Sequence, residues 1–225
     1  MADRGRLHLV LEGQTEEVIT REVLRPYLES VGWFVSFSVI KTRRPASGPA
    51  QRGGVSSWPH IERDVRRLLR DRSITTVTTL LDYYAFPREA PGMASRPVGD
   101  AVTRVKHVEQ ALAAAIGDDR FLPNLVLHEI EAWVLAAHEQ LGSLYEDPRL
   151  ARILRKEIDA AGGPELVNDG PSTAPSKRLL RHKPDYLKTL DGPMAVVDLG
   201  LRRLREQCPH LDQWFVKLEV DADRA

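Results

Sequence analysis

The chain has 225 residues, 42% of them apolar and 28% charged, which is typical of a globular protein, and no apolar run approaches the roughly 18 residues of a membrane span. The 32 Lys and Arg equal the 32 Asp and Glu, so the net charge is zero and any basic surface must be local. The single cysteine, Cys208, excludes a disulfide within the chain, argues against a cysteine-based zinc site, and suits a reducing cytoplasm.

The first part of the chain alternates between strand and helix patterns. Residues 7–11 are a short apolar run that predicts a buried strand, and residues 15–31 repeat apolar residues at helical spacing. The elements expected next are a strand at 33–40, helix at 60–72, strand at 74–81, helix at 100–116, strand at 121–127, and helix through Trp133 to about His138. This order predicts an α/β fold, with a parallel sheet flanked by helices on both faces.

The rest of the chain is mostly helical in pattern. We expect an α/β domain over residues 1–140 and a helical C-terminal region over residues 141–225 that packs on it. Residues 169–178 predict a loop that enters a helix.

Acidic residues follow three of the four predicted strands. Glu12 comes after the first strand, Asp82 after the third and Glu129 after the fourth. Because the carboxyl ends of parallel strands meet at one edge of a sheet, where ligands bind, we expect these acids to converge. Glu16, four residues after Glu12, opens the next helix and can reach the same place. Each acid taken alone is also typical of a helix cap or first turn, so the prediction depends on the joint pattern.

Glu131 is a further candidate ligand. If residues 129 and 131 both lie in a helix, they point to different sides and only one faces the site; in an extended segment both can. Clustered carboxylates repel each other unless a cation sits among them, and their hard oxygens suit Mg²⁺ or Mn²⁺. Such an ion can clamp a phosphodiester and activate water. Lys177, at the start of a predicted helix, is the candidate for stabilising charge in the transition state.

A long basic loop is the candidate nucleic-acid contact. Residues 41–59 contain Lys41, Arg43, Arg44 and Arg52 and no acidic residue, as expected of a segment that binds phosphates. Tyr84 is either a core residue or an aromatic ring on which a base stacks. The arginines of helix 60–72 alternate with acids and predict an ordinary solvated face.

Two familiar motifs are absent. The zinc-protease pattern HExxH would need a second histidine four residues after His128, where the chain has Ala132. The segment from Gly170 to Lys177 lacks the glycine that precedes lysine in a phosphate-binding P-loop.

Four segments resemble known motifs. Residues 12–16 (EGQTE) resemble the EGxTE first motif of Toprim-like proteins, especially those related to OLD-type (overcoming lysogenization defect) nucleases. Residues 80–87, 127–133 and 168–178 resemble the DYYGFP, HExEA and NDGPxTAPSKR segments of an uncharacterised bacterial Toprim-like family, known as a domain of unknown function. The similarity spans residues 6–190, with the motifs in the same order.

The resemblance implies a Toprim-like fold, with Glu12 and Glu16 as metal ligands or acid/base groups and Asp82 as a metal ligand. Related domains often act as nuclease effectors beside ATPases in phage-defence loci. The usual second Toprim motif is Asp-x-Asp, whereas this chain has Asp82-Tyr83-Tyr84. Either Glu129 or Glu131 replaces the missing carboxylate, or the site holds one metal or is degenerate.

We therefore predict Mg²⁺- or Mn²⁺-dependent hydrolysis of phosphodiester bonds in DNA or RNA, with an ATPase as a candidate partner. Two alternatives stay open: a catalytically silent scaffold that binds a partner ATPase or nucleic acid, and a phosphoesterase for a small phosphate or nucleotide. The expected residues are the metal ligands Glu12, Asp82, Glu129 and Glu131, the catalytic Glu12, Glu16 and Lys177, and the nucleic-acid contacts Lys41, Arg43, Arg44, Arg52, Tyr84 and Arg178.

Overall fold

The fold is organised around a parallel sheet. The computed structural model describes residues 4–40, 57–84, 86–167 and 173–224. The strands are β1 (Arg6–Leu11), β2 (Phe34–Val39), β3 (Thr76–Asp82), β4 (Phe121–Leu122) and β5 (Leu125–Val126). Their order is β2-β1-β3-β4, β5 also pairs with β3, and every pairing is parallel. The predicted α/β class, with its parallel sheet, is confirmed.

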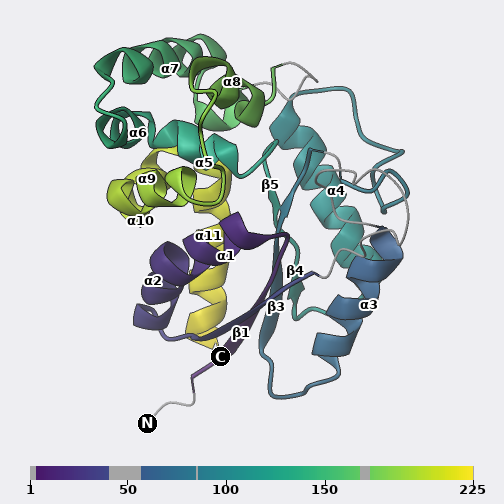
Figure 1. Cartoon of the computed structure of the whole chain (residues 1–225). Helices are drawn as coiled ribbons and strands as arrows, with labels where there is room; N and C mark the ends of the chain where they lie inside the picture. The colour runs from purple at the N-terminus through teal and green to yellow at the C-terminus, as the bar shows by residue number, and fades with distance from the viewer. Residues whose placement is uncertain (1–3, 41–56, 85, 168–172, 225) are drawn as a thin grey trace, which may run out of the picture.

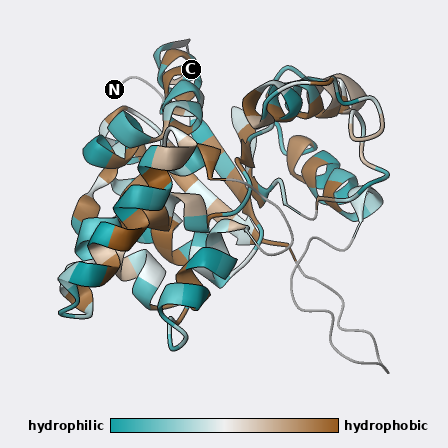
Figure 2. Cartoon of the chain, turned by 90° about the horizontal axis from the view of Figure 1, so that it is seen from above, coloured by the Kyte–Doolittle hydropathy of each residue, from teal (hydrophilic) through white to brown (hydrophobic). Residues whose placement is uncertain are grey.

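Helices cover both faces of the sheet (Figure 1). One face carries α1 (Gln14–Ile19), the π-helical turn η1 (Thr20–Leu24), α2 (Arg25–Ser30) and the last helix, α11 (Pro209–Arg224); the other carries α3 (Trp58–Leu69) and α4 (Ala101–Ile116). Each face has its own cluster of buried apolar side chains. Seen from above, the strands and the inward faces of the helices are the more hydrophobic parts (Figure 2).

The predicted fourth strand is broken into two short pieces. Pro123 and Asn124 separate β4 from β5. Proline has no amide hydrogen for the ladder, and the Thr79 side chain takes over the bonding at this point. Its hydroxyl donates to the Asn124 carbonyl at 2.8 Å and accepts from the Asn124 amide at 2.9 Å. The backbone groups at the break are thus satisfied without a continuous strand.

The remaining helices gather above the carboxyl end of the sheet (Figure 1). They are α5 (Glu131–Ala136), α6 (His138–Leu144), α7 (Pro148–Ala161), the 3₁₀ turn η2 (Pro164–Leu166), α8 (Pro175–His182), α9 (Asp191–Leu199) and α10 (Leu201–Gln207). The helix expected through Trp133 to about His138 is α5, which ends at Ala136, and α6 follows it from His138. Within the described residues, no helix is both long and apolar enough to cross a membrane.

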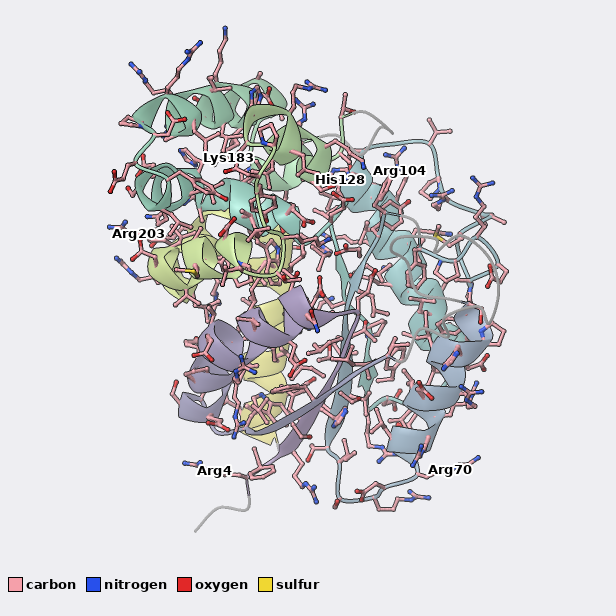
Figure 3. The ribbon with its side chains drawn as sticks, viewed as in Figure 1. Arg4, Arg70, Arg104, His128, Lys183 and Arg203 are labelled. Atoms are coloured by element: carbon pink, nitrogen blue, oxygen red, sulfur yellow. The ribbon has the colours of Figure 1, made fainter. Side chains whose placement is uncertain are left out.

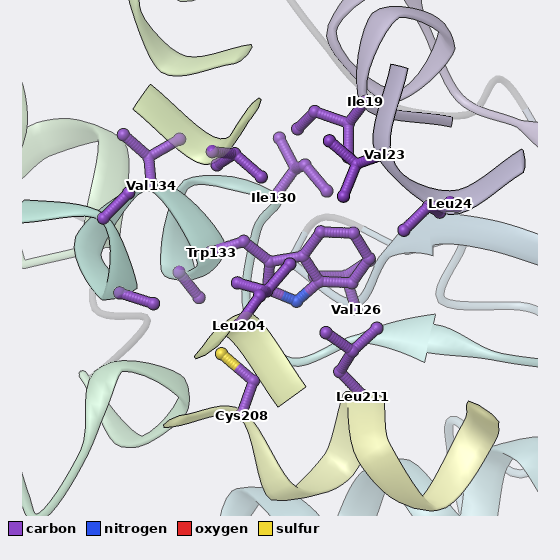
Figure 4. Close-up of a cluster of buried hydrophobic side chains, with 14 of the residues drawn as sticks. Ile19, Val23, Leu24, Val126, Ile130, Trp133, Val134, Leu204, Cys208 and Leu211 are labelled. Carbon is purple, nitrogen blue, oxygen red and sulfur yellow. The ribbon is translucent and has the colours of Figure 1, made fainter. Parts of the chain in front are cut away.

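The C-terminal region shares its core with the sheet. The indole of Trp33 donates to the Leu218 carbonyl at 3.0 Å, and that of Trp214 donates to the Thr78 hydroxyl at 2.9 Å. Trp133 lies among apolar side chains of the N-terminal and C-terminal segments, including Ile19 and Leu211 (Figure 4). One buried cluster therefore joins residues from 7 to 218, and the division at residue 140 stays a prediction.

Candidate carboxylate site

The carboxyl ends of β1 and β3 place Glu12 beside Asp82. The two strands are paired in register, with Leu11 opposite Leu80. The Glu12 amide donates to the Leu80 carbonyl at 3.2 Å, and the Glu12 carboxylate accepts from the Asp82 amide at 2.9 Å. The side chain of Glu12 is thus held across the end of the neighbouring strand.

The turn into α1 brings Glu16 to the same place. Glu16 is only 3% exposed. A Cβ atom at Gly13 would lie 3.3 Å from Oε2 of Glu16, so the glycine leaves room for this carboxylate to fold back over the turn. The spacing of four residues that predicted a shared site for Glu12 and Glu16 therefore corresponds to a real proximity.

The start of α5 contributes the next acid. His128, with φ of 63°, turns the chain at the end of β5, at the carboxyl edge of the sheet (Figure 3). The Ile130 amide then donates to Oδ1 of Asp82 at 2.8 Å. Glu131, the first residue of α5, is completely buried.

Glu129 and Glu131 take different directions. The Glu129 carboxylate accepts from the Ser176 amide at 3.0 Å, in the first turn of α8. Glu131 instead joins the electrostatic group formed by Glu12 and Asp82. Glu129 stays close to Glu131, because its charge raises the pKa of Glu131, while its own carboxylate is turned toward the α8 backbone.

A lysine that sequence reasoning missed lies among the carboxylates. Nζ of Lys188 is 3.0 Å from Oε1 of Glu131, and the Lys188 side chain is 46% exposed. Lys188 lies between α8 and α9, in a polar segment that predicts an ordinary surface loop. No local signal marks it, because its partner is 57 positions earlier in the chain.

The acids have raised pKa values because they are buried together. Burial, with smaller contributions from Glu16 and Glu131, raises the pKa of Glu12 to about 7. Burial likewise raises the pKa of Glu131 to about 7, against the opposing effect of Lys188, and raises the pKa values of Glu16 and Asp82. Burial alone would lower the pKa of Lys188, but the surrounding carboxylates, chiefly Glu131 and Asp82, raise it.

The donor set fits a hard divalent cation in chemistry, but its side chains are not arranged as a finished metal site. Both carboxylate oxygens of Glu131 are buried; Oε1 is paired with Lys188, whereas Oε2 has no hydrogen bond with the described residues and retains acceptor capacity. Within the described ranges, however, no group of three or more His, Cys, Asp or Glu side chains stands where it could hold a metal ion. One oxygen each of Glu12 and Asp82 faces a backbone amide, and Lys188 pairs with Glu131.

Of the other predicted site residues, those that the structure describes make no hydrogen bond or ion pair with these carboxylates, and the rest lie outside the described ranges. Lys177 is exposed on α8. Arg178 pairs with Glu157 at 3.0 Å and donates to the Thr173 carbonyl at 2.7 Å. Tyr84 is half-buried, and its amide donates to the His128 carbonyl at 2.6 Å. The residues outside the described ranges are Lys41, Arg43, Arg44 and Arg52.

Two solved structures are similar to the chain over nearly its whole length. The C-terminal region of the Burkholderia pseudomallei OLD protein aligns with a TM-score of 0.41 and 13% identity, covering 95% of this chain and 98% of that one. The C-terminal region of the Xanthomonas campestris pv. campestris OLD protein aligns with a TM-score of 0.38 and 17% identity, with the same coverage.

No protein of curated function matches the chain. A family described as "Domain of unknown function (DUF4276)" matches residues 11–219. This match covers all four carboxylates of the site as well as Lys188. The chain therefore belongs to the DUF4276 family.

Proposed function

We propose that the chain hydrolyses phosphodiester bonds in nucleic acid, with a divalent metal ion held at the carboxylate site. This site is defined as Glu12, Glu16, Asp82 and Glu131. The observation that carries the proposal is the gathering of four acids, three of them buried and Glu12 half-buried, from three separate segments, at the carboxyl edge of a parallel sheet. Burying charges beside like charges is unfavourable, so a purely structural role would not account for the cluster.

The proposed roles follow from where each side chain stands. Glu12, Asp82 and Glu131 would hold Mg²⁺ or Mn²⁺, with Glu129 the predicted additional ligand. When bound, such an ion neutralises phosphate charge and lowers the pKa of water. Glu16 faces the same group and would serve as a ligand or as the base that accepts a proton from water.

The substrate contacts belong to the proposal as well. The basic residues of the 41–59 segment, with Tyr84 and Arg178, would hold the nucleic acid, and Lys177 on α8 would stabilise charge on the phosphate. The Toprim-like motif resemblance supports these assignments, as it does a partner ATPase. Three prominent cavities, of about 410 to 590 Å³, are lined by none of the four carboxylates, so they do not favour a small enclosed phosphate substrate.

One observation favours a second function, that of a catalytically silent scaffold for an ATPase or nucleic acid. Lys188 already neutralises part of the charge in the carboxylate site, and the second Asp of the Toprim motif is replaced by Tyr84. A scaffold would keep the acids paired in this way and would bind no metal. Metal binding therefore separates the two functions.

The test combines cleavage with metal binding. Purified protein is incubated with labelled single- and double-stranded DNA and RNA in Mn²⁺, Mg²⁺ or EDTA, beside the variants Glu12→Gln and Asp82→Asn. We expect metal-dependent cleavage that falls at least about 100-fold in both variants, the range for loss of a catalytic group.

The matched control is Glu219→Gln, because Glu219 is a half-buried acid whose partners are Arg205 and Tyr27 rather than residues of the site or the proposed substrate contacts. This variant should cleave like the wild type. If all four proteins behave alike and calorimetry detects no metal binding, the catalytic proposal fails and the scaffold takes its place.

A further inference from the structure

The carboxylate site already contains a cation of its own. Among the residues that the structure describes, Lys188 places its ammonium group beside the acids of this site. Its nitrogen lies 3.0 Å from Glu131, and its charge acts on Glu12, Glu16, Asp82 and Glu131 alike. Without this ammonium the cluster would hold up to four negative charges with no counter-ion, which a buried site does not tolerate.

The backbone around Lys188 is held firmly. Tyr186 is buried, and the carboxylate of Asp191 accepts from the Leu187 amide at 2.7 Å and from the hydroxyl of Tyr145. These contacts fix the segment between α8 and α9 on the helices beneath it. The position of the Lys188 Cα atom is therefore set independently of the ion pair.

The side chain of Lys188, in contrast, is partly exposed to solvent and can leave the site. It is 46% exposed, whereas its partner Glu131 is completely buried. A lysine carries its charge on a flexible four-carbon stem and is strongly hydrated, so its ammonium can move into solvent without disturbing the backbone. Glu131 cannot follow and would be left in need of another cation.

Glu131 is also the acid with free ligand capacity. Its Oε2 makes no hydrogen bond with the described residues, and its Oε1 is paired with Lys188. A divalent cation needs such oxygens and would be repelled by an ammonium that stayed beside them. Lys188 and the metal thus require the same carboxylates and exclude each other.

We propose that Lys188 is a resident counter-ion that holds the carboxylate site in its metal-free state and is displaced when a divalent cation binds. This inference rests on the proposed function, since it assumes that the site takes Mg²⁺ or Mn²⁺. It explains why the acids are gathered while no finished metal arrangement is present in the described residues. The role of Lys188 is to keep the site folded and to set its metal affinity.

The test measures Mn²⁺ affinity and thermal stability, without using activity. Lys188→Met keeps the length of the stem and removes the charge, and we expect it to bind Mn²⁺ about tenfold more tightly in calorimetry, because a competing charge a few ångströms away is gone. In EDTA the same variant should melt at a lower temperature than the wild type. Saturating Mn²⁺ should remove or reverse that difference, because the metal replaces the lost charge.

Two further variants make the test specific. Lys188→Arg keeps a cation and should bind Mn²⁺ with about the affinity of the wild type. Lys217→Met removes an exposed lysine on α11 that makes no ion pair with the described residues, so it controls for a general change in charge. It should match the wild type in both measurements.

The outcomes separate this inference from the proposed function. If the wild type binds Mn²⁺ and Lys188→Met binds it no more tightly, the counter-ion role is wrong while the metal-dependent function stands. If neither protein binds Mn²⁺ or Mg²⁺, both proposals fail. If only Lys188→Met binds metal, Lys188 occupies the site permanently, and both its displacement by a cation and the metal-dependent function of the wild type are wrong.

Discussion

Two buried groups of ionisable side chains differ in how their charges are satisfied. The first is the carboxylate site. The second, here called the α11 anchor, consists of Glu109, Glu165 and His210 and lies where α11 meets α4 and β5. Both are buried and both contain more than one acid, so burial and acidity alone do not distinguish them.

The α11 anchor is almost fully hydrogen-bonded. Glu109 accepts from the Leu125 amide at 2.8 Å and lies 3.2 Å from Nε2 of His210. Glu165 accepts from the amides of His210 and Leu211, at 2.8 and 3.2 Å, at the start of α11. Each acid of the anchor therefore has a defined structural partner.

The carboxylate site, in contrast, contains a hydrogen-bond acceptor without a partner among the described residues. Oε2 of Glu131 has no hydrogen-bond partner among the described residues, and Lys188, which pairs with Oε1, has a side chain that is 46% exposed. Buried acids alone therefore do not indicate a ligand site. The group suited to bind a ligand is the one that has an unsatisfied acceptor beside a displaceable cation. Three variants sharpen this distinction, besides the cleavage and metal-binding experiments above.

The largest change in stability is expected in the α11 anchor. Glu165→Ala removes the acceptor of two buried backbone amides at the start of α11, which should lower the free energy of unfolding by about 2–4 kcal/mol. Urea unfolding measures the loss, and the exposed Glu139→Ala serves as the control. A loss no greater than that of the control would show that the anchor is not structural.

In the carboxylate site we expect a substitution that increases the stability of the protein. Burial raises the pKa of Glu12 to about 7, so its ionised form opposes folding; this penalty grows above the ordinary pKa of 4.5 and is complete above about pH 7. Glu12→Gln removes the charge and keeps an oxygen for the Asp82 amide, so it should raise the free energy of unfolding by about 1–3 kcal/mol near pH 8. Near pH 4 the gain should vanish. A variant that is less stable than the wild type at pH 8 would contradict this account.

The smallest expected effect is a pH dependence of the stability that the α11 anchor contributes through His210. Burial would lower the pKa of His210, but the hydrogen bond and charge of Glu109, with Glu165 adding, raise it. The charged imidazole therefore stabilises the fold fully below the ordinary pKa of 6.5, and this contribution is lost as the pH rises through the raised value. The stability difference between wild type and His210→Gln should shrink by about 1 kcal/mol from pH 6 to pH 9, as measured by urea unfolding. A difference that grows with pH would mean that His210 acts mainly as a neutral group.

Several features could be predicted from local pattern alone. Short apolar runs and helical spacing identify β1, β2, β3 and α4 nearly at their observed ends, because backbone periodicity determines which residues can be buried. The positions of Glu12 and Asp82 follow from the same pattern. Once the strands are parallel, residues that follow them must lie at one edge.

Other features depended on contacts between distant residues. The break between β4 and β5 is satisfied by Thr79, and the last helix covers one face of the sheet through Trp214. Glu129 and Glu131 have the same local surroundings in sequence, and only the approach of α8 separates their roles. Lys188 has no local signal at all.

The sequence by itself determined the strand and helix order, the parallel sheet that this order favours, and the edge at which Glu12, Glu16 and Asp82 meet. The contact of Glu129 with α8 and the pairing of Lys188 with Glu131 came only from the packing of the helices. The physical reason is the range of the interactions. Periodicity and strand direction act over a few residues, whereas charge pairing in a buried site joins whichever side chains the packed helices bring together.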